Sequence, residues 1–292
     1  MRSPLRRLAA KTPILGRALR EIDTRRLYRE VCREFGEDFQ NDHVGRIDAL
    51  GYRFPFCSPT GAYLRPSFRG RVYEPSTSAH LVDHFSDRPI GFIDIGAHFG
   101  FFSCLVARFN PGSRVAAFEP GPDAFEVLKK NFALNQIQGG AYALALSDEA
   151  SSVPFKGVSM KVDAHQTSLR VATEKFDTWQ AQSAAPFDVV KIDVHGSEGK
   201  VLFGMQHTLR RDRFALYLEL HPDELLVGYS LAEIVALVLD SGFAMHEITE
   251  FRKDARYELV AVDADRRARL VDPARWTTAE RRGRRMFFCE KP

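Results

Sequence analysis

Apolar and polar positions follow two periods along this chain, and the alternation between them predicts a repeated strand–helix order. Residues 91–95 form a short apolar run rich in β-formers, which suits a strand buried on both faces of a parallel sheet. Glycines then interrupt the run, and residues 101–109 resume with the apolar spacing of a helix. Further strands are expected at residues 114–118, 141–146, 187–194, 214–220, 243–248, 257–262 and 285–289, and further helices at residues 125–134, 198–209 and 231–239. This order predicts an α/β domain built on a mostly parallel sheet.

The chain before this domain has a different charge and a different pattern of apolar and polar residues. Residues 1–20 carry six basic side chains and no acidic one, and a helical pattern continues from residue 23 to residue 39. Residues 46–64 alternate between apolar and polar positions around a Pro-Thr-Gly turn, which indicates short antiparallel strands. We therefore divide the chain into a basic helical N-terminal arm (1–42), a small β cap on the substrate side (43–75) and a main domain (76–292).

Two arginine-rich segments leave two interpretations open. The arm is either a surface for an acidic partner or a solvated helix that packs on the domain or on a second copy of the chain. The segment 266–285 is either a contact for an acidic substrate or a solvated basic insertion.

Composition narrows the class of protein. A chain of 292 residues with 45% hydrophobic residues can bury a full core, and a net charge of +3 gives no reason to expect a nucleic-acid partner. No apolar run reaches the ~18 residues that a transmembrane helix needs. The 4 cysteines show no C-x-x-C spacing, so a zinc site is not expected. With no signal-peptide pattern either, we expect a cytoplasmic protein, and a homodimer stays open.

The first predicted strand ends in a turn with the features of a nucleotide site. Gly96 and Gly100 have no Cβ, so backbone N–H groups at the start of the following helix can approach a ligand closely. Asp94 places a fixed carboxylate beside that turn. Glu119 follows the next strand about 25 residues later, near the spacing at which a carboxylate meets ribose hydroxyls. This combination suits a nucleotide-like ligand with a cationic part.

The glycine spacing distinguishes between two such ligands. A nicotinamide dinucleotide site needs G-x-G-x-x-G, whereas His98 stands at the middle glycine position. Close approach to a pyrophosphate is therefore not provided, which disfavours an NAD-dependent oxidoreductase. The pattern Asp-x-Gly-x-x-x-Gly followed by Glu119 and Pro120 fits S-adenosylmethionine better, because its cationic end benefits from Asp94.

Several motifs resemble one enzyme family. They are Asp94-Ile95-Gly96-Ala97-His98-Phe99-Gly100, Phe118-Glu119-Pro120-Gly121-Pro122, Leu128-Lys129-Lys130-Asn131 with Asn135, Ala145-Leu146-Ser147-Asp148, Val189-Val190-Lys191-Ile192-Asp193-Val194-His195-Gly196-Ser197-Glu198 and Leu218-Glu219-Leu220-His221. Over roughly residues 73–250 the chain thereby resembles the FkbM family of S-adenosylmethionine-dependent methyltransferases. The family pattern has Glu where this chain has His195. The resemblance implies a class I methyltransferase (Rossmann-like) three-layer sandwich, whose mostly parallel seven-stranded sheet has the order 3-2-1-4-5-7-6 and an antiparallel last strand.

The expected donor site gathers residues from several strand ends. The candidate cofactor-binding residues are Tyr73, Glu74, Asp94, Gly96, Ala97, His98, Gly100, Glu119, Pro120, Ser147, Asp148 and Asp193. Asp148 either accepts a hydrogen bond from the adenine amine or is a turn residue. Tyr73 and Glu74 either lie next to the glycine turn or are turn residues without a special role.

The expected acceptor side lies at two neighbouring strand ends. Asp193 and His195 are two residues apart at one end, and Glu219 and His221 at the next, so each pair can lie on one side of the sheet. An alcohol is a poor nucleophile near neutral pH, and histidine is well suited as its base. We predict His195 or His221 as base, with Asp193 orienting the acceptor or the donor.

The residues at and after these strand ends allow two further roles, metal binding and stabilisation of a helix. A divalent metal held by Asp193, Glu219 and a histidine such as His221 is an alternative that the ligand types permit, but we expect none. Glu198 is expected in a first helical turn, where a carboxylate is favoured.

The resemblance implies transfer of methyl to a hydroxyl, with S-adenosylhomocysteine as product. The expected acceptor is a sugar, a glycoside or a polyketide or peptide natural product. An N-methyltransferase on a similar molecule, or an S-adenosylmethionine-binding protein with altered catalysis, remain the alternatives.

Overall fold

The computed structural model describes residues 43–59, 73–155, 169–183, 186–249, 256–272 and 285–291. Its main sheet has the order β12-β11-β13-β10-β9-β3-β4-β5. The strands are β3 (Gly91–Ile95), β4 (Arg114–Phe118), β5 (Gln138–Tyr142), β9 (Val189–Ile192), β10 (Ala215–Leu220), β11 (Ala244–Ile248), β12 (Leu259–Ala261) and β13 (Arg285–Glu290). From β5 to β10 every pair is parallel, whereas β13 runs antiparallel to both β10 and β11. The predicted order 3-2-1-4-5-7-6 is therefore confirmed, and β12 adds an antiparallel strand at the edge.

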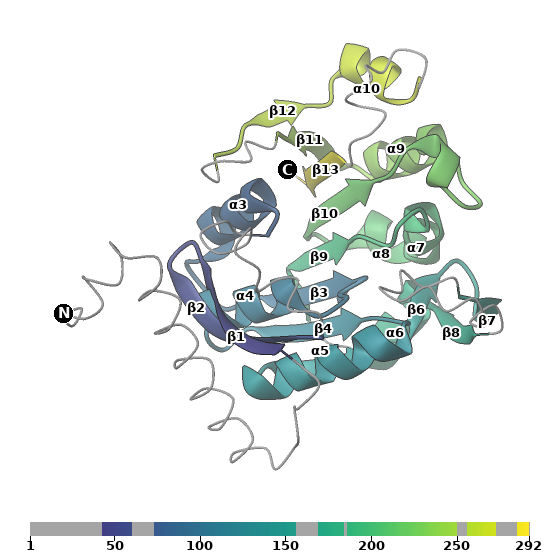
Figure 1. Cartoon of the computed structure of the whole chain (residues 1–292). Helices are drawn as coiled ribbons and strands as arrows, with labels where there is room; N and C mark the ends of the chain where they lie inside the picture. Colours follow the sequence, from purple (N-terminus) through teal and green to yellow (C-terminus); the bar gives the residue numbers. More distant parts are fainter. Residues whose placement is uncertain are drawn as a thin grey trace.

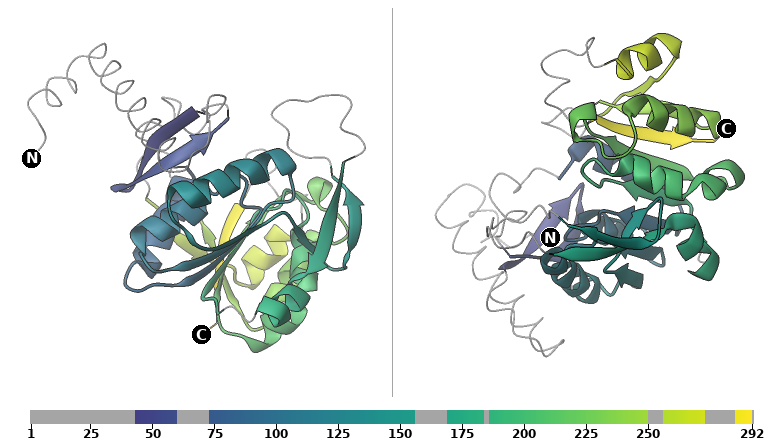
Figure 2. Two further views of the ribbon diagram at one scale, coloured as in Figure 1. Left: turned by 90° about the horizontal axis from the view of Figure 1, so that it is seen from below. Right: turned by 90° about the vertical axis from the view of Figure 1, so that its right-hand side faces the viewer.

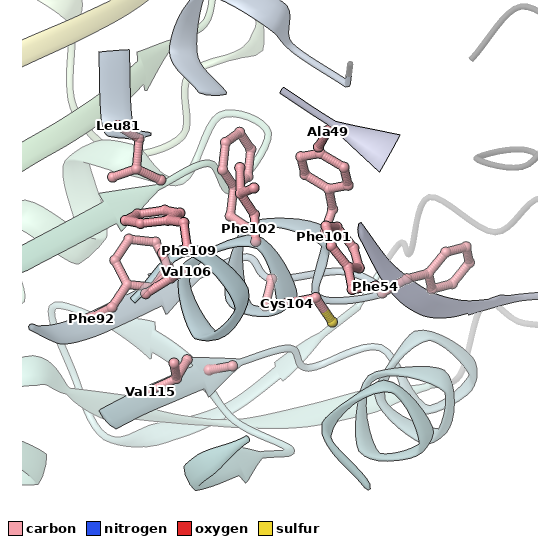
Figure 3. Close-up of a cluster of buried hydrophobic side chains, with 14 of the residues drawn as sticks. Ala49, Phe54, Leu81, Phe92, Phe101, Phe102, Cys104, Val106, Phe109 and Val115 are labelled. Atoms are coloured by element: carbon pink, nitrogen blue, oxygen red, sulfur yellow. The ribbon is translucent and has the colours of Figure 1, made fainter. Parts of the chain in front are cut away.

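Helices cover both faces of this sheet, which gives the predicted three layers (Figures 1 and 2). One face carries α3 (Pro75–Phe85), α4 (Phe101–Phe109) and α5 (Pro122–Leu134); the other carries α6 (Phe176–Ser183), α7 (Glu198–Gly204), α8 (Gln206–Arg211), α9 (Leu231–Asp240) and α10 (Ala264–Leu270). Successive residues of a strand contribute to opposite layers: Phe92 belongs to the first core and Ile93 to the second. Figure 3 shows part of the first core, where Phe92 and Val115 of the sheet meet the side chains of α4. Within the described residues, no helix is long and apolar enough to cross a membrane.

The antiparallel strands predicted before the main domain are present as a hairpin of β1 (His43–Ala49) and β2 (Tyr52–Ser58). Phe54 and Phe56 of β2 are buried in the first core, with ring centroids 6.0 and 6.5 Å from Phe101 of α4. Asn131 of α5 accepts a hydrogen bond from the Cys57 backbone N–H at 2.6 Å and donates to the Cys57 carbonyl at 3.0 Å. The hairpin therefore shares the core of the main sheet. The predicted arm (1–42) and residues 60–72 of the cap lie outside the described residues, and the proposed domain division stays a prediction.

Two predicted elements are wrong in their bounds. The apolar stretch 141–146 is not one strand: β5 starts and ends earlier, and β6 (Ala145–Ser147) joins a separate three-stranded sheet with β8 (Arg170–Lys175) and β7 (Ser151–Pro154). The start of β5 depends on Gly139, where a Cβ would lie 1.9 Å from the Val115 carbonyl oxygen. Likewise the helix predicted at 198–209 is split into α7 and α8 at Met205, next to Gly204, whose missing Cβ lets the Ser147 carbonyl approach.

Candidate active site

The turn after β3 is pressed against the ends of two neighbouring strands. The backbone N–H groups of Gly96 and Ala97 both donate to the Phe118 carbonyl at the end of β4, each at 3.0 Å. Gly96 has φ +79°, and a Cβ there would lie 1.8 Å from the Asp193 carbonyl oxygen after β9. Only glycine combines this left-handed conformation with so close an approach. The turn therefore joins three strand ends in one place.

Asp94 lies beneath this turn and is only 1% exposed. Its Oδ2 accepts a hydrogen bond from the Ser103 hydroxyl at 2.7 Å. Its Oδ1 is buried and has no hydrogen-bond partner among the residues that the structure describes. Burial raises the pKa of this carboxyl, and the nearby Lys191 ammonium opposes that shift. A buried acceptor atom left without a donor indicates a place for a ligand group that donates or carries positive charge.

Glu119, at the end of β4, closes the other side of the turn and is followed by Pro120. Its Oε2 accepts the His98 backbone N–H at 3.0 Å, and its Oε1 accepts the Gly121 N–H at 2.8 Å. Burial raises its pKa to about 7, although both hydrogen bonds oppose that change. Each oxygen keeps a lone pair, which suits the predicted contact with ribose hydroxyls.

Tyr73 and Glu74 lie where α3 begins, beside the start of α4. This position is consistent with the prediction that they lie next to the glycine turn. The Tyr73 ring is 5.2 Å from the ring of Phe101, the first residue after Gly100, measured between centroids. Gly100 itself has φ +81°, and a Cβ there would meet Leu128 at 2.6 Å. Glu74 has φ +43° and contributes to the electrostatic field around Lys191.

Ser147 and Asp148 lie at the end of β6, next to α7. Asp148 Oδ1 accepts hydrogen bonds from the Ser147 hydroxyl at 3.0 Å and from Lys200 Nζ at 3.1 Å, and its Oδ2 accepts from the Tyr229 hydroxyl at 3.0 Å. These contacts fix the orientation of the carboxylate through protein groups. A contact between Asp148 and adenine stays a prediction.

Lys191, which the sequence indicates only as part of a motif, is a buried cation. Its Nζ lies 3.3 Å from Asp193 Oδ2 and 4.8 Å from the centre of the Phe102 ring. Burial lowers the pKa of Lys191, but four carboxylates, Asp193, Glu74, Asp94 and Glu219, outweigh it and raise that pKa overall. One lysine thus lies among four acidic side chains. Because the acidic groups outnumber this cation, the cluster favours an additional positive charge.

Glu219 belongs to the same cluster and has a strongly raised pKa. Burial raises its pKa to about 10, helped by a hydrogen bond to Asp193 and by the charge of that neighbour. The raised pKa favours the protonated form of Glu219, which can donate a hydrogen bond to Asp193.

The predicted convergence of Asp193, His195 and His221 is present. His195 Nδ1 lies 3.8 Å from Asp193 Oδ1, and the rings of His195 and His221 are 5.2 Å apart between centroids. The two histidines differ in access: 48% of the His195 side chain is exposed, against 4% for His221. His195 also has φ +53°, in the left-handed region. This side of the cluster opens to solvent at His195.

Glu198 makes a contact that the sequence does not predict. It lies in the first turn of α7 as predicted, but it is fully buried, and its Oε1 accepts hydrogen bonds from His221 Nδ1 at 2.8 Å and from the Gly196 N–H at 3.0 Å. The two residues are 23 positions apart and meet only because α7 packs beside β10. Nothing local in the sequence indicates this pair.

His98, in the glycine turn, interacts electrostatically with the same cluster. Burial, together with the charge of His195, lowers the pKa of His98 to about 4. The residue at the middle glycine position is therefore close enough to the histidine cluster for its charge to affect the pKa of His98.

Comparison with known families decides what this arrangement is. The model of the methyltransferase FkbM domain matches residues 94–256, more than half of the chain. The chain belongs to the FkbM methyltransferase family. The match begins at the buried Asp94 of the glycine turn and includes both histidines of the cluster.

Three curated relatives support this assignment. Methyltransferase sdnD of Sordaria araneosa is 28% identical over 176 residues, which cover 46% of this chain and 68% of that protein. The 31-O-demethyl-FK506 methyltransferase FkbM of Streptomyces tacrolimicus is 26% identical over 190 residues, covering 52% and 72%. The hexuronic acid methyltransferase AglP of Haloferax volcanii is 26% identical over 169 residues, covering 55% and 66%.

As an FkbM-family enzyme with the class I methyltransferase fold, the chain uses S-adenosylmethionine as methyl donor. When bound, this cofactor supplies a methyl group on a sulfonium and leaves as S-adenosylhomocysteine. The residues fit it: Asp94 offers a buried oxygen without a protein donor, Glu119 can accept from hydroxyls, and the carboxylates around Lys191 favour a cation.

Proposed function

We propose that this methyltransferase transfers methyl to a hydroxyl oxygen of a sugar or natural product. The observation that carries the proposal is the cluster of Asp193, His195 and His221 at the open side of the site. A hydroxyl must lose its proton as its oxygen attacks, and imidazoles are suited to promote that loss near neutral pH. A neutral amine already has a lone pair and needs no such cluster.

The two sides of the site have separate tasks in this proposal. The turn with Asp94 and Glu119 holds the donor, supported by Tyr73, Glu74 and the Ser147–Asp148 pair. Asp193 and the histidines face the acceptor, which enters at His195 because its side chain is the exposed one. Holding both reactants in line accounts for much of the rate of such a transfer.

The name of one relative agrees with transfer to oxygen, and the name of another gives a sugar acid as its substrate. One acts on 31-O-demethyl-FK506 and the other on a hexuronic acid. We therefore favour a small molecule of that kind, a sugar acid, glycoside, polyketide or peptide, as acceptor. Cytoplasmic location and a homodimer stay predictions.

The test uses S-adenosylmethionine with a deuterated methyl group and a panel of hexuronic acids, glycosides and hydroxylated polyketides. Each compound is paired with an analogue that carries an amine in place of the hydroxyl. Mass spectrometry and NMR then identify the labelled atom. We expect label on oxygen; label on nitrogen alone, from the amine partners, would contradict the proposal.

The same assay tests the role of His195. Asparagine tolerates a left-handed backbone, so His195→Asn removes the imidazole while it keeps the turn. We expect kcat to fall by about 100-fold or more, the usual effect of losing proton-transfer assistance, with S-adenosylhomocysteine binding little changed. His207→Asn, at an exposed histidine on α8, is the matched control and should keep full activity. Equal turnover by wild type and His195→Asn would show that the histidine cluster does not assist the loss of the acceptor proton.

A further inference from the structure

We propose that Asp193, His195 and His221 bind a divalent transition-metal cation beside the acceptor, an inference that rests on the proposed function and specifies how the hydroxyl is activated. One donor atom from each residue lies within 4.8 Å of the other two. Asp193 Oδ1 and His195 Nδ1 are 3.8 Å apart, too far for a hydrogen bond. Two ligands each at about 2.1 Å from one ion lie roughly 3.0–4.2 Å apart, depending on their angle. The spacing therefore suits two ligands of a shared ion.

His221 gives an independent reason to place a ligand here. Its Nδ1 is engaged by Glu198 at 2.8 Å, and its Nε2 is buried without a hydrogen-bond partner within the described part of the chain. A buried nitrogen that meets no protein donor or acceptor needs a ligand to satisfy it. Metal-bound histidines generally donate their second ring N–H to a carboxylate, which fixes the tautomer and the orientation. Glu198, itself held by the Gly196 N–H, provides this support.

A second group of acidic residues competes for the assignment and is less suitable. Donor atoms of Glu74, Asp193 and Glu219 also lie within 4.8 Å of one another. The Lys191 ammonium already lies beside this group, 3.3 Å from Asp193 Oδ2. Asp193 thus faces the lysine with one oxygen and His195 with the other. The histidine side is where a metal ion can be added without displacing a resident cation.

The donor set indicates the class of metal. Two imidazoles and one carboxylate suit Zn²⁺, Co²⁺, Ni²⁺ or Fe²⁺ better than Mg²⁺ or Ca²⁺, which prefer oxygen ligands alone. Three protein ligands leave a coordination position open, as in catalytic sites. The half-exposed His195 gives an entry path for the ion and the acceptor.

The chemical consequence concerns the acceptor proton. A hydroxyl in the open position would have its pKa lowered by the cation, so that its O–H bond breaks and the proton passes to solvent at the His195 side. The electron pair would stay on oxygen, which would form the new bond to the methyl carbon while the carbon–sulfur bond of the donor breaks and its electron pair leaves on the sulfur of S-adenosylhomocysteine. In this site His195 and His221 serve as ligands, in place of the base role predicted from the sequence.

The test measures metal binding by the full chain directly. Metal-stripped protein is titrated with Co²⁺, followed by its visible absorption, and with Zn²⁺ by calorimetry. We expect one ion per chain. His195→Asn and His221→Gln should weaken binding by about 100-fold, Glu198→Gln by about 10–100-fold as for other supporting carboxylates, and His207→Asn not at all.

Because His221 is buried, its variant can fail to fold, whereas the exposed His195→Asn keeps the test decisive. Absence of a stoichiometric ion, or equal affinity in wild type and His195→Asn, overturns the metal site. Turnover separates this inference from the proposed function. If metal-free protein methylates oxygen at full rate, the metal site fails and the O-methyltransferase stands. If the metal-loaded protein binds one ion but methylates only nitrogen, the metal site stands and the proposed function fails.

Discussion

Replacing Glu119 by glutamine should change the pH dependence of stability in a way that the structure allows us to calculate. The carboxyl is 7% exposed and accepts two backbone N–H groups, and burial raises its pKa from 4.5 to about 7. Since the folded-state pKa is the higher one, the folded protein binds this proton more tightly than the unfolded chain does. Ionising Glu119 therefore destabilises the fold increasingly as the pH rises from about 4.5 to about 7.

The size of the effect follows from the two pKa values. Glu119 lowers the free energy of unfolding by about 1 kcal/mol at pH 5 and by about 3 kcal/mol at pH 8. Glutamine keeps the shape but has no proton to lose. The difference in free energy of unfolding between Glu119→Gln and wild type should thus shift by about 2 kcal/mol in favour of the variant between pH 5 and pH 8. His80 and His98, whose pKa values burial lowers to about 4, act in both proteins and cancel in this difference.

Urea denaturation of both proteins at four pH values between 5 and 8 measures this difference. Binding of S-adenosylhomocysteine gives a second readout, because hydrogen bonds to a charged acceptor contribute about 1.5–3 kcal/mol. The variant should bind about 10-fold or more weakly at pH 8, where the difference in stability has shifted in its favour. Parallel stability curves for the two proteins would show that Glu119 titrates normally and refute the reasoning.

Three further substitutions test the supports of the site by chemical denaturation. Gly96→Ala should lower the free energy of unfolding by more than Gly242→Ala does. Both substitutions cost about 1–2 kcal/mol because the backbone is left-handed, but only the new Cβ at position 96 would also lie 1.8 Å from a carbonyl oxygen. Equal losses of stability would contradict this explanation. Asn131→Ala removes three hydrogen bonds to buried backbone groups and should cost about 3 kcal/mol; a loss below about 1 kcal/mol would mean that the hairpin is held otherwise. Lys191→Met leaves buried carboxylates without their cation and should lower the free energy of unfolding by about 3–5 kcal/mol. An unchanged denaturation midpoint would show that the lysine does not stabilise this cluster.

What the sequence predicted well depends on local pattern. The glycine turn, the strand ends that carry Asp94 and Glu119, and the strand order all follow from short apolar runs and their spacing, together with the family resemblance. The paired strand ends with His195 and His221 could also be predicted, since parallel strands end at one edge of a sheet.

What the sequence did not predict depends on contacts between distant segments. Gly139 weakens the strand pattern, so the start of β5 was missed, although its missing Cβ is what lets the chain approach β4. Glu198 reads as an ordinary residue of a first helical turn, and only the packing of α7 beside β10 shows that it holds His221. The central role of Lys191 likewise requires four acidic side chains from four segments.

Calorimetric titration of the full chain with S-adenosylhomocysteine tests the central claim most directly, namely that the glycine turn with Asp94 holds the methyl donor. Asp94→Asn is the matched variant, because it keeps the shape of the side chain and removes its charge. We predict one bound ligand per wild-type chain and an affinity at least about 10-fold lower in the variant, as expected for loss of a charged hydrogen bond. No binding at millimolar ligand, or equal affinity in both proteins, would contradict the account.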